Sequence, residues 1–277
     1  MDRRRSGVLL HPTSLPGGAG CGDLGADAFR FVNWLAEVGF AVWQTLPLGP
    51  TLEPLGSPYT CLSAHAGNPL LIALEPLEAA GWLAPEPGPG SGEGWADFRK
   101  RRLREARAGF EQIAGEAEWR DYRAFQADHE HWLEDFARFM AVRHLEGDQA
   151  WWHWPAPLRD RDPEAMVELA SEHAGELEQV RFEQYLFFRQ WHALRTHANE
   201  RGVRLFGDMP IFVAHDSAEV WARRELFALD ETGDLETAAG VPPDYFSETG
   251  QYWGNPHYRW ERMAANGYRW WIERMQT

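Results

Sequence analysis

The hydrophobic and polar positions near the start of the chain predict alternating strands and helices. Residues 6–10 form a short apolar run, which predicts a first strand, and residues 41–46 predict a second strand. Between them, residues 27–38 carry apolar side chains at helical spacing and end at Gly39, as helices often do. A strand, a helix and a second strand in this order indicate a βαβ unit, which favours parallel strands.

The middle of the chain has a different composition and a different spacing of apolar residues. Residues 84–94 are rich in proline and glycine and mark a boundary. Residues 95–113, 119–146 and 164–202 then place an apolar side chain at every third or fourth position, which predicts helices. We interpret residues 95–200 as a helical subdomain inserted into an α/β framework.

The last part of the chain returns to the α/β pattern. Residues 203–207 predict a third strand, and residues 217–222 predict the start of a helix capped by Ser217. Residues 229–258 show almost no periodicity and predict a long loop, whereas residues 258–275 are helical again. The expected organisation is 1–83 for the first strands and helices with a substrate loop, 84–94 for the boundary, 95–200 for the insert, and 201–277 for the third strand, the active-site loop and a helix.

Charge and composition exclude several classes of protein. The 277 residues contain 27 basic and 42 acidic side chains, a net charge of −15, which argues against nucleic acid as a partner. The apolar runs are too short for a transmembrane helix or a signal peptide, so we expect a cytoplasmic protein with no membrane partner. Two cysteines, Cys21 and Cys61, do not make a disulfide framework.

Aromatic residues are abundant, with 15 Trp, 15 Phe and 7 Tyr. Several lie in polar surroundings rich in glycine and proline, as in residues 251–256. A sugar ring has apolar C–H faces and polar edges, so exposed aromatic rings suit carbohydrate, whereas buried ones fill a core. Composition alone leaves both interpretations open.

Two motifs suggest chemistry that their context does not support. Residues 20–25 match G-x-G-x-x-G, but nine residues separate them from the strand, and no acidic residue follows at the distance that dinucleotide binding requires. Residues 128–131 read Asp-His-Glu-His, yet on a helix the two histidines point to different faces. We therefore expect no cofactor and no metal.

Asp208 follows the third predicted strand, at its carboxyl end. In barrels this end carries the active site, and a carboxylate there can accept hydrogen bonds from sugar hydroxyl groups. The same aspartate could equally cap the loop that leaves the strand. The residues themselves leave the two interpretations open.

Longer motifs indicate a family. The chain resembles 4-α-glucanotransferase, also called amylomaltase or disproportionating enzyme, of the α-amylase clan. The matching segments are residues 6–15, 22–25, 43–49, 57–59, 68–70, 207–220 and 240–258. The resemblance implies an α/β fold class, specifically the N-terminal part of a TIM (β/α)₈ barrel with an inserted helical subdomain, the barrel being incomplete in this chain.

The resemblance also implies a reaction. Members of the family cleave an α-1,4 bond in a malto-oligosaccharide and transfer the glucan to the 4-hydroxyl of another glucan. The mechanism resembles that of retaining glycosidases, with two carboxyl groups and a covalent glycosyl-enzyme intermediate. The expected partner is therefore a malto-oligosaccharide or another α-glucan, and no cofactor is implied.

Several residues take roles from the resemblance. Tyr59 resembles the tyrosine that stacks beneath the donor glucose, and Asp208 resembles the aspartate that hydrogen-bonds the same sugar. His215 resembles a residue that supports the site. A mobile loop over the cleft is expected to comprise Tyr245, Phe246, Gly250, Trp253, Gly254 and Asn255.

One family motif is missing. The nucleophilic aspartate of the family lies in an R-x-D-H-F-R-G motif, which these residues do not contain. We therefore expect no catalytic residue within the chain, with the nucleophile and the acid/base beyond Thr277, and the chain to be the N-terminal portion of a longer enzyme. The alternative is a non-catalytic glucan-binding protein derived from the same fold. The DNA that follows codon 277 would discriminate between them.

Overall fold

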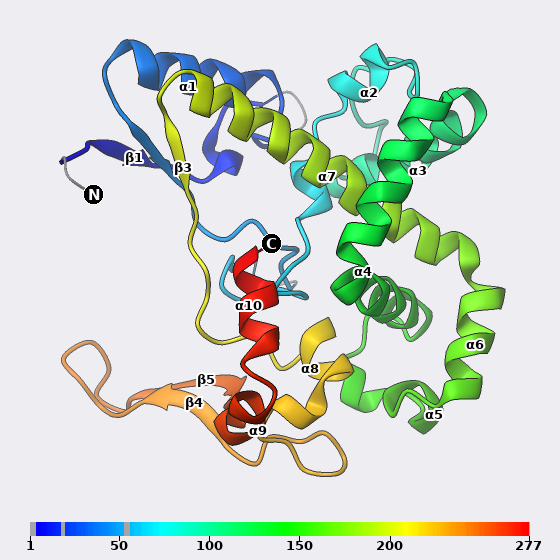
Figure 1. The fold of residues 1–277 in the computed structure, drawn as a ribbon, viewed down its shortest axis with the longest axis vertical. Helices are drawn as coiled ribbons and strands as arrows, with labels where there is room; N and C mark the ends of the chain where they lie inside the picture. Colours follow the sequence, from blue (N-terminus) through cyan, green and yellow to red (C-terminus); the bar gives the residue numbers. More distant parts are fainter. Residues whose placement is uncertain (1–3, 18–19, 53–55, 277) are drawn as a thin grey trace. The chain divides into compact units, whose positions relative to one another are not determined.

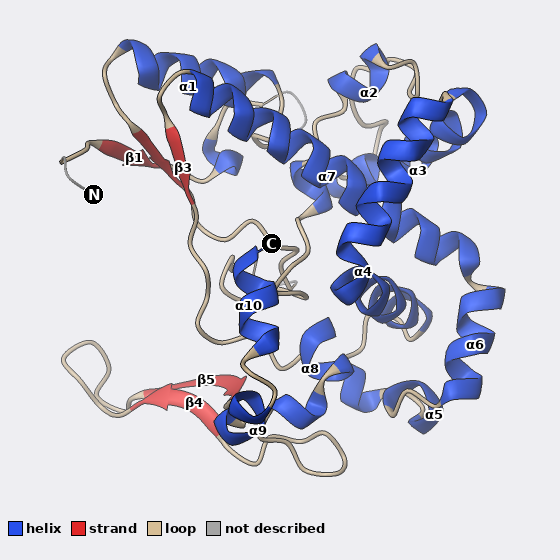
Figure 2. Cartoon of the chain, viewed as in Figure 1, coloured by secondary structure: helices blue, strands red, loops and turns tan. Residues whose placement is uncertain are grey.

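The computed structural model describes residues 4–17, 20–52 and 56–276 and shows a mixed α/β protein (Figures 1 and 2). The strands are β1 (Gly7–Leu9), β2 (Val42–Gln44), β3 (Arg204–Phe206), β4 (Ala238–Val241) and β5 (Gln251–Pro256). The α-helices are α1 (Ala26–Glu37), α2 (Glu75–Ala79), α3 (Trp95–Ile113), α4 (Glu116–Leu145), α5 (Ala156–Arg159), α6 (Pro163–Glu172), α7 (Ala174–Glu200), α8 (Ala218–Ala222), α9 (Trp260–Ala265) and α10 (Arg269–Gln276). Short 3₁₀ helices are η1 (Pro12–Ser14), η2 (Pro69–Leu71), η3 (Trp151–His153) and η4 (Arg224–Leu226). None of the helices in the described ranges has the length and apolar character that a bilayer crossing requires.

The strands β1, β2 and β3 form a parallel sheet in that order (Figure 2). Val8 pairs with Trp43, and Trp43 pairs with Leu205, so β2 is central. Parallel strands need a crossover connection, which α1 provides between β1 and β2. The crossover from β2 to β3 contains α2 to α7 and most of the helical residues. The sequence-based prediction of parallel strands is confirmed.

The glycine-rich stretch before α1 packs the chain tightly. A Cβ on Gly22 would lie 2.0 Å from the carbonyl oxygen of Pro12, so no other residue fits there. The Asp23 carboxylate accepts the backbone N–H of Gly25 at 2.9 Å and the buried guanidinium of Arg99 at 2.7 Å. Close backbone packing before α1 thus explains Gly22, the second glycine of the Gly-x-Gly-x-x-Gly pattern, because glycine is the residue that permits it.

The described chain divides into two compact units built from discontinuous segments. Unit 1 comprises Met1–Leu48, Gly67–His129 and Arg181–Met209, and unit 2 comprises Gly49–Ala66, Glu130–Val180 and Pro210–Thr277. The linear organisation expected above follows the order of the sequence and stays a prediction.

Unit 1 has an aromatic core centred on Phe110 of α3. Its ring centroid lies 4.9 Å from that of Trp82, 4.8 Å from that of Trp119 and 5.1 Å from that of Phe182. Phe110 is 1% exposed, and such edge and tilted contacts stabilise beyond the area they bury. Most of the abundant aromatic residues of α3, α4 and α7 therefore fill a core.

Two buried glutamines fix the chain that enters α2. The amide of Gln184 bonds both the N–H and the C=O of Gly67, at 2.8 and 3.0 Å. Gln190 does the same to Ala73, at 2.8 and 2.9 Å. Each side chain replaces a missing backbone partner, because buried backbone groups need hydrogen bonds.

Unit 2 has its own aromatic core. The ring of Trp154 lies 5.4 Å from Phe139 and 5.6 Å from Trp221, and Trp151 is completely buried nearby in the same unit. The indole N–H groups of Trp151 and Trp221 donate to backbone carbonyls of His215 and Leu158. The polar ends of these two buried indoles are thus satisfied.

The structure confirms most predicted elements and corrects three. Residues 229–258, expected to form a loop, contain the antiparallel strands β4 and β5. The helix expected over 164–202 is two helices, because the backbone turns at His173, and the helix expected over 258–275 is α9 and α10. A further short helix, α2, was not predicted. Backbone pairing and turns, unlike apolar periodicity, leave little trace in the side-chain pattern.

Candidate functional site

The strands β4 and β5 form a hairpin that depends on glycine. Val241 pairs with Gln251 across the hairpin, which Figure 1 shows in orange. A Cβ on Gly240 would lie 2.4 Å from the carbonyl oxygen of Gln251. Gly250 has φ 77°, a left-handed conformation that glycine adopts without strain. The predicted loop residue Gly250 therefore has a structural reason to be glycine.

The tip of the hairpin closes through its own hydrogen bonds and leaves its rings exposed. The Asp244 carboxylate accepts the backbone N–H groups of Phe246 and Ser247 at 2.9 and 2.8 Å. Tyr245 is 97% exposed and Phe246 is 88% exposed, with ring centroids 5.6 Å apart at 89°. These two rings are held on an ordered turn without being part of a core.

Trp253 lies on β5 and is half exposed. Its Nε1 donates to the side-chain oxygen of Gln251 at 3.0 Å, and its ring centroid lies 6.3 Å from that of Phe212. Tyr252 beside it is 78% exposed, and Gly254 has φ 71°. The hairpin thus carries four exposed or half-exposed aromatic side chains, each with a ring able to stack on an apolar ring face.

The base of the hairpin is tied to residues 210–213. The amide of Asn255 donates to the carbonyl oxygen of Val213 at 2.8 Å, and the buried hydroxyl of Tyr258 donates to that of Ile211 at 2.7 Å. Burial raises the pKa of Tyr258 to about 12, so this hydroxyl stays protonated and remains a donor into the alkaline range. Asn255 therefore anchors the hairpin.

His215 joins three parts of unit 2. Its ring stacks on Trp152, with centroids 4.0 Å apart and planes at 6°, and its Nε2 lies 2.8 Å from the carbonyl oxygen of Gly233. The indole of Trp151 donates to the backbone carbonyl of His215. Burial lowers the pKa of His215, which favours a neutral ring that donates Nε2–H to Gly233.

Asp216 is a buried carboxylate that the sequence analysis did not assign to the site. It accepts the guanidinium of Arg143 at 2.5 Å and the backbone N–H of Trp151 at 3.3 Å. Burial raises the pKa of Asp216, and Arg143 opposes this by favouring the ionised form. In the sequence, only its position next to His215 could have pointed to Asp216 as a residue of the site.

Tyr59 lies in the segment Gly49–Ala66 of unit 2. Its side chain is 46% exposed, and its backbone N–H donates to the Ser57 hydroxyl at 3.3 Å. Residues 53–55 of this segment lie outside the described residues. Tyr59, His215 and the hairpin residues therefore belong to the same compact unit.

Asp208 lies in unit 1, two residues after β3, and is half-buried. His11 occupies the equivalent place after β1, and the structure adds it to the predicted residues at the carboxyl end of the sheet. Its Nδ1 lies 2.7 Å from the Thr13 hydroxyl, and its Nε2 lies 3.3 Å from the carbonyl oxygen of Pro47. Burial lowers the pKa of His11. The approach of Asp208 to Tyr59, which the sequence predicts, stays a prediction.

The Asp-His-Glu-His run at residues 128–131 lies on α4. The His129 ring stacks on Phe125 at 4.4 Å, and its Nδ1 lies 3.0 Å from the Phe125 carbonyl oxygen. Within residues 4–17, 20–52 and 56–276, no three His, Cys, Asp or Glu side chains gather in a way that could hold a metal ion. His129 is thus a residue of helix packing.

The comparison with known sequence families decides the family. Residues 10–277 match the family described as 4-alpha-glucanotransferase. The chain belongs to the 4-alpha-glucanotransferase family.

Individual 4-alpha-glucanotransferases support this assignment. The chain is 49% identical to that of Thermus thermophilus over 279 residues, which cover 99% of this chain and 55% of the relative. It is 44% identical to that of Synechocystis, covering 100% of this chain and 57% of the relative. Among solved structures, amylomaltase from Streptococcus agalactiae in complex with acarbose matches with a TM-score of 0.89 and 37% identity, over 99% of this chain and 57% of that one. The chain thus spans a little over half the length of these relatives.

Proposed function

We propose that the chain is the glucan-binding part of a 4-α-glucanotransferase, which moves α-1,4-glucan segments between malto-oligosaccharides by a retaining double displacement. One combination of observations supports this proposal. The chain matches the family over residues 10–277, and one hairpin presents the exposed rings of Tyr245, Phe246 and Trp253. Such rings stack on the apolar faces of glucose units. The related amylomaltase from Streptococcus agalactiae was solved with acarbose, which supports an oligosaccharide ligand here.

We further propose that β1, β2 and β3 are the first strands of a (β/α)₈ barrel, with residues 95–200 inserted between the second and third. The parallel order β1-β2-β3 supports this, because neighbouring barrel strands follow one another along the chain. Asp208 and His11 then belong to the carboxyl-end face, where barrel enzymes bind substrate. A cytoplasmic location remains part of the proposal.

Each proposed site residue has a distinct role. Tyr59 provides a platform for the donor glucose, and Asp208 accepts hydrogen bonds from its hydroxyl groups. His215 and Asn255 support the binding surface, since both bond to backbone carbonyls. The hairpin residues contact the glucan chain, with Gly250 and Gly254 shaping the turn and the strand. None of these residues is assigned as the nucleophile or the acid/base.

Binding of the chain to maltoheptaose, measured by isothermal titration calorimetry, tests the proposal. Cellohexaose, which has β-1,4 bonds, is the control ligand. We expect binding of maltoheptaose and little binding of cellohexaose, because the family that the chain matches is described as acting on α-linked glucans, as 4-alpha-glucanotransferase. Equal binding of both, or of neither, would contradict the proposal. Incubation with maltotriose, followed by analysis for glucose and longer maltodextrins, reports transfer itself.

Trp253→Ala should weaken maltoheptaose binding by about tenfold, because the indole loses its stacking contact. The thermal midpoint should change little, since the side chain is 48% exposed. Trp34→Ala is the matched control, because Trp34 on α1 is 47% exposed but lies outside the proposed site. Equal losses of binding in the two variants would remove Trp253 from the site.

A further inference from the structure

The described residues of the segment Gly49–Ala66, here called the Tyr59 loop, fold back on one another. The backbone N–H of Leu62 donates to Pro50 at 2.8 Å, and Thr51 and Cys61 form an antiparallel bridge. The Cys61 thiol donates to the carbonyl oxygen of Pro58 at 3.1 Å. The turn that carries Tyr59 is therefore coupled to the returning limb of the loop, residues 60–66.

The returning limb is held against α8. The backbone N–H of Ala218 donates to the Leu62 carbonyl at 2.9 Å. The Ser63 hydroxyl donates to the Glu219 carboxylate at 2.6 Å. These bonds connect the loop to the first turn of α8 within unit 2, although the partners are more than 150 residues apart in the sequence.

The Ser63 hydroxyl is the centre of this contact. While its proton is directed to Glu219, its oxygen accepts the backbone N–H groups of His65 and Ala66, each at 3.1 Å. A hydroxyl has one proton and two lone pairs, so all of its hydrogen-bonding capacity is used. Rotation of the hydroxyl away from Glu219 would weaken the bonds to both amides.

Both side chains of the contact between Ser63 and Glu219 are buried. Ser63 is 3% exposed and Glu219 is 6% exposed. Burial raises the pKa of Glu219, and the hydrogen bond from Ser63 opposes this. A buried carboxyl group that loses its donor is costly, whereas a matched pair orders the groups around it. The Ser63 hydroxyl is therefore a donor that the buried Glu219 carboxyl group needs.

We propose that Glu219 is a positioning residue, which fixes the returning limb of the Tyr59 loop through the Ser63 hydroxyl and so sets the place of Tyr59. The consequence for glucan binding rests on the proposed function. The positioning itself rests on the contacts of Ser63 with Glu219, His65 and Ala66. Glu219 has no assigned contact with substrate and is not a catalytic residue.

Hydrogen exchange of the backbone amides of residues 57–66 tests the positioning directly. Glu219→Ala and Ser63→Ala should each speed exchange at His65 and Ala66 by about tenfold, because Ser63→Ala removes the acceptor of both amides and Glu219→Ala removes the group that orients the Ser63 hydroxyl. Glu219→Gln retains an oxygen acceptor and should restore most of the protection. Glu225→Ala, an exposed glutamate of the same unit, is the control and should change nothing. Unchanged exchange in Glu219→Ala, or an equal increase along the whole chain, would overturn the proposal.

Maltoheptaose binding tests whether the effect passes through Tyr59. Glu219→Ala should weaken binding by about fivefold in the natural sequence and add nothing in a Tyr59→Ala background, because the positioned group is already gone. The losses of thermal stability should still add. Additive losses of affinity would show that Glu219 acts on binding by another route. If the natural chain binds no maltoheptaose, the proposed function fails, while the exchange experiment still decides the positioning.

Discussion

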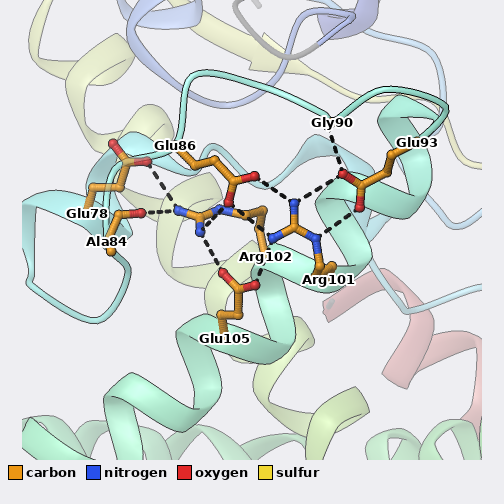
Figure 3. A network of polar contacts seen from close by, with 8 residues as sticks. All are labelled: Glu78, Ala84, Glu86, Gly90, Glu93, Arg101, Arg102 and Glu105. Atoms are coloured by element: carbon orange, nitrogen blue, oxygen red, sulfur yellow. Dashed lines mark hydrogen bonds and ion pairs between the residues drawn. The ribbon is translucent and has the colours of Figure 1, made fainter.

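Arg101 on α3 and Arg143, which bonds Asp216 just before α8, both pair with carboxylates. The first arginine is partly exposed, whereas the second is buried with its partner. On α3, Arg101 bonds Glu86, Glu93 and Glu105 at 2.8 to 2.9 Å, and the neighbouring Arg102 shares two of these partners (Figure 3). The Arg101 side chain is 37% exposed. In the segment before α8, Asp216 bonds one arginine, and both side chains are about one-tenth exposed.

The difference lies in what replaces a lost partner. Without Arg101, Glu86 and Glu105 keep Arg102, and Glu93 keeps the backbone N–H of Gly90, so its loss leaves none of these carboxylates without a partner (Figure 3). Asp216 is buried, and Arg143 is the charge that balances it. Removing one member of a buried pair leaves an uncompensated charge, which costs far more than the pair itself contributes. The comparison teaches that the number of partners and their burial, more than bond length, determine how much stability is lost when a charged side chain is removed.

The largest expected effect is therefore that of Arg143→Met. It should lower the free energy of unfolding by about 3–5 kcal/mol, because Asp216 stays buried without its counter-charge. Urea unfolding at pH 7 measures the change. The cost should shrink as the pH falls, since the pKa of Asp216, already raised by burial, rises further without Arg143 and the group becomes neutral.

The double variant Arg143→Met with Asp216→Asn sharpens this test. Asparagine keeps an oxygen for the backbone N–H of Trp151 and removes the charge, so part of the stability should return. A cost of Arg143→Met below about 1 kcal/mol would place the pair with the exposed ones of α3.

The sequence could predict elements that depend on the burial of one face, and it could not predict those that depend on backbone pairing. The helix over 95–113 was predicted with its observed bounds, because Phe98, Leu103, Ala106 and Phe110 recur at helical spacing and are all buried. The hairpin was not predicted, because its pairing depends on glycine backbone at Gly240 and Gly250. Periodicity reports burial of one face, and it carries no record of backbone pairing between segments.

The candidate site likewise contains residues that the sequence could indicate and residues that it could not. The aromatic residues near positions 245–253 stand out in a polar context, and the structure shows them exposed. Asp216 and Glu219 were not assigned, because their partners lie 73 and 156 residues away and only folding brings them together. His11 follows a strand as Asp208 does, and the same placement argument could have found it.

An intermediate effect is expected for Ser217→Ala. The Ser217 hydroxyl caps α8 by accepting the backbone N–H of Val220 and donates to the Ala214 carbonyl at 2.7 Å, in a completely buried position. Losing the cap should cost about 1 kcal/mol. Ser171→Ala is the control, because the Ser171 hydroxyl also bonds a backbone carbonyl but is exposed. Equal urea midpoints for the two variants would mean that burial adds nothing to the cap.

The smallest effect is expected for Arg101→Met, and salt and pH give it a recognisable signature. Hydrogen bonds from Arg101 hold the pKa values of Glu86 and Glu93 below their ordinary 4.5. A lowered pKa in the folded state adds stability that is present above the unfolded value and is lost as the pH falls through the folded value. The difference in thermal midpoint between the natural chain and Arg101→Met should therefore be small at pH 7, decline below pH 4.5 and disappear once the pH is below the lowered pKa values of Glu86 and Glu93. It should also fade in about 1 M salt, where charges are screened within about 3 Å. Arg104→Met, an exposed arginine of the same helix, is the control. A salt-independent loss in Arg101→Met, as large as that of Arg143→Met, would show that the exposed network is as indispensable as the buried pair.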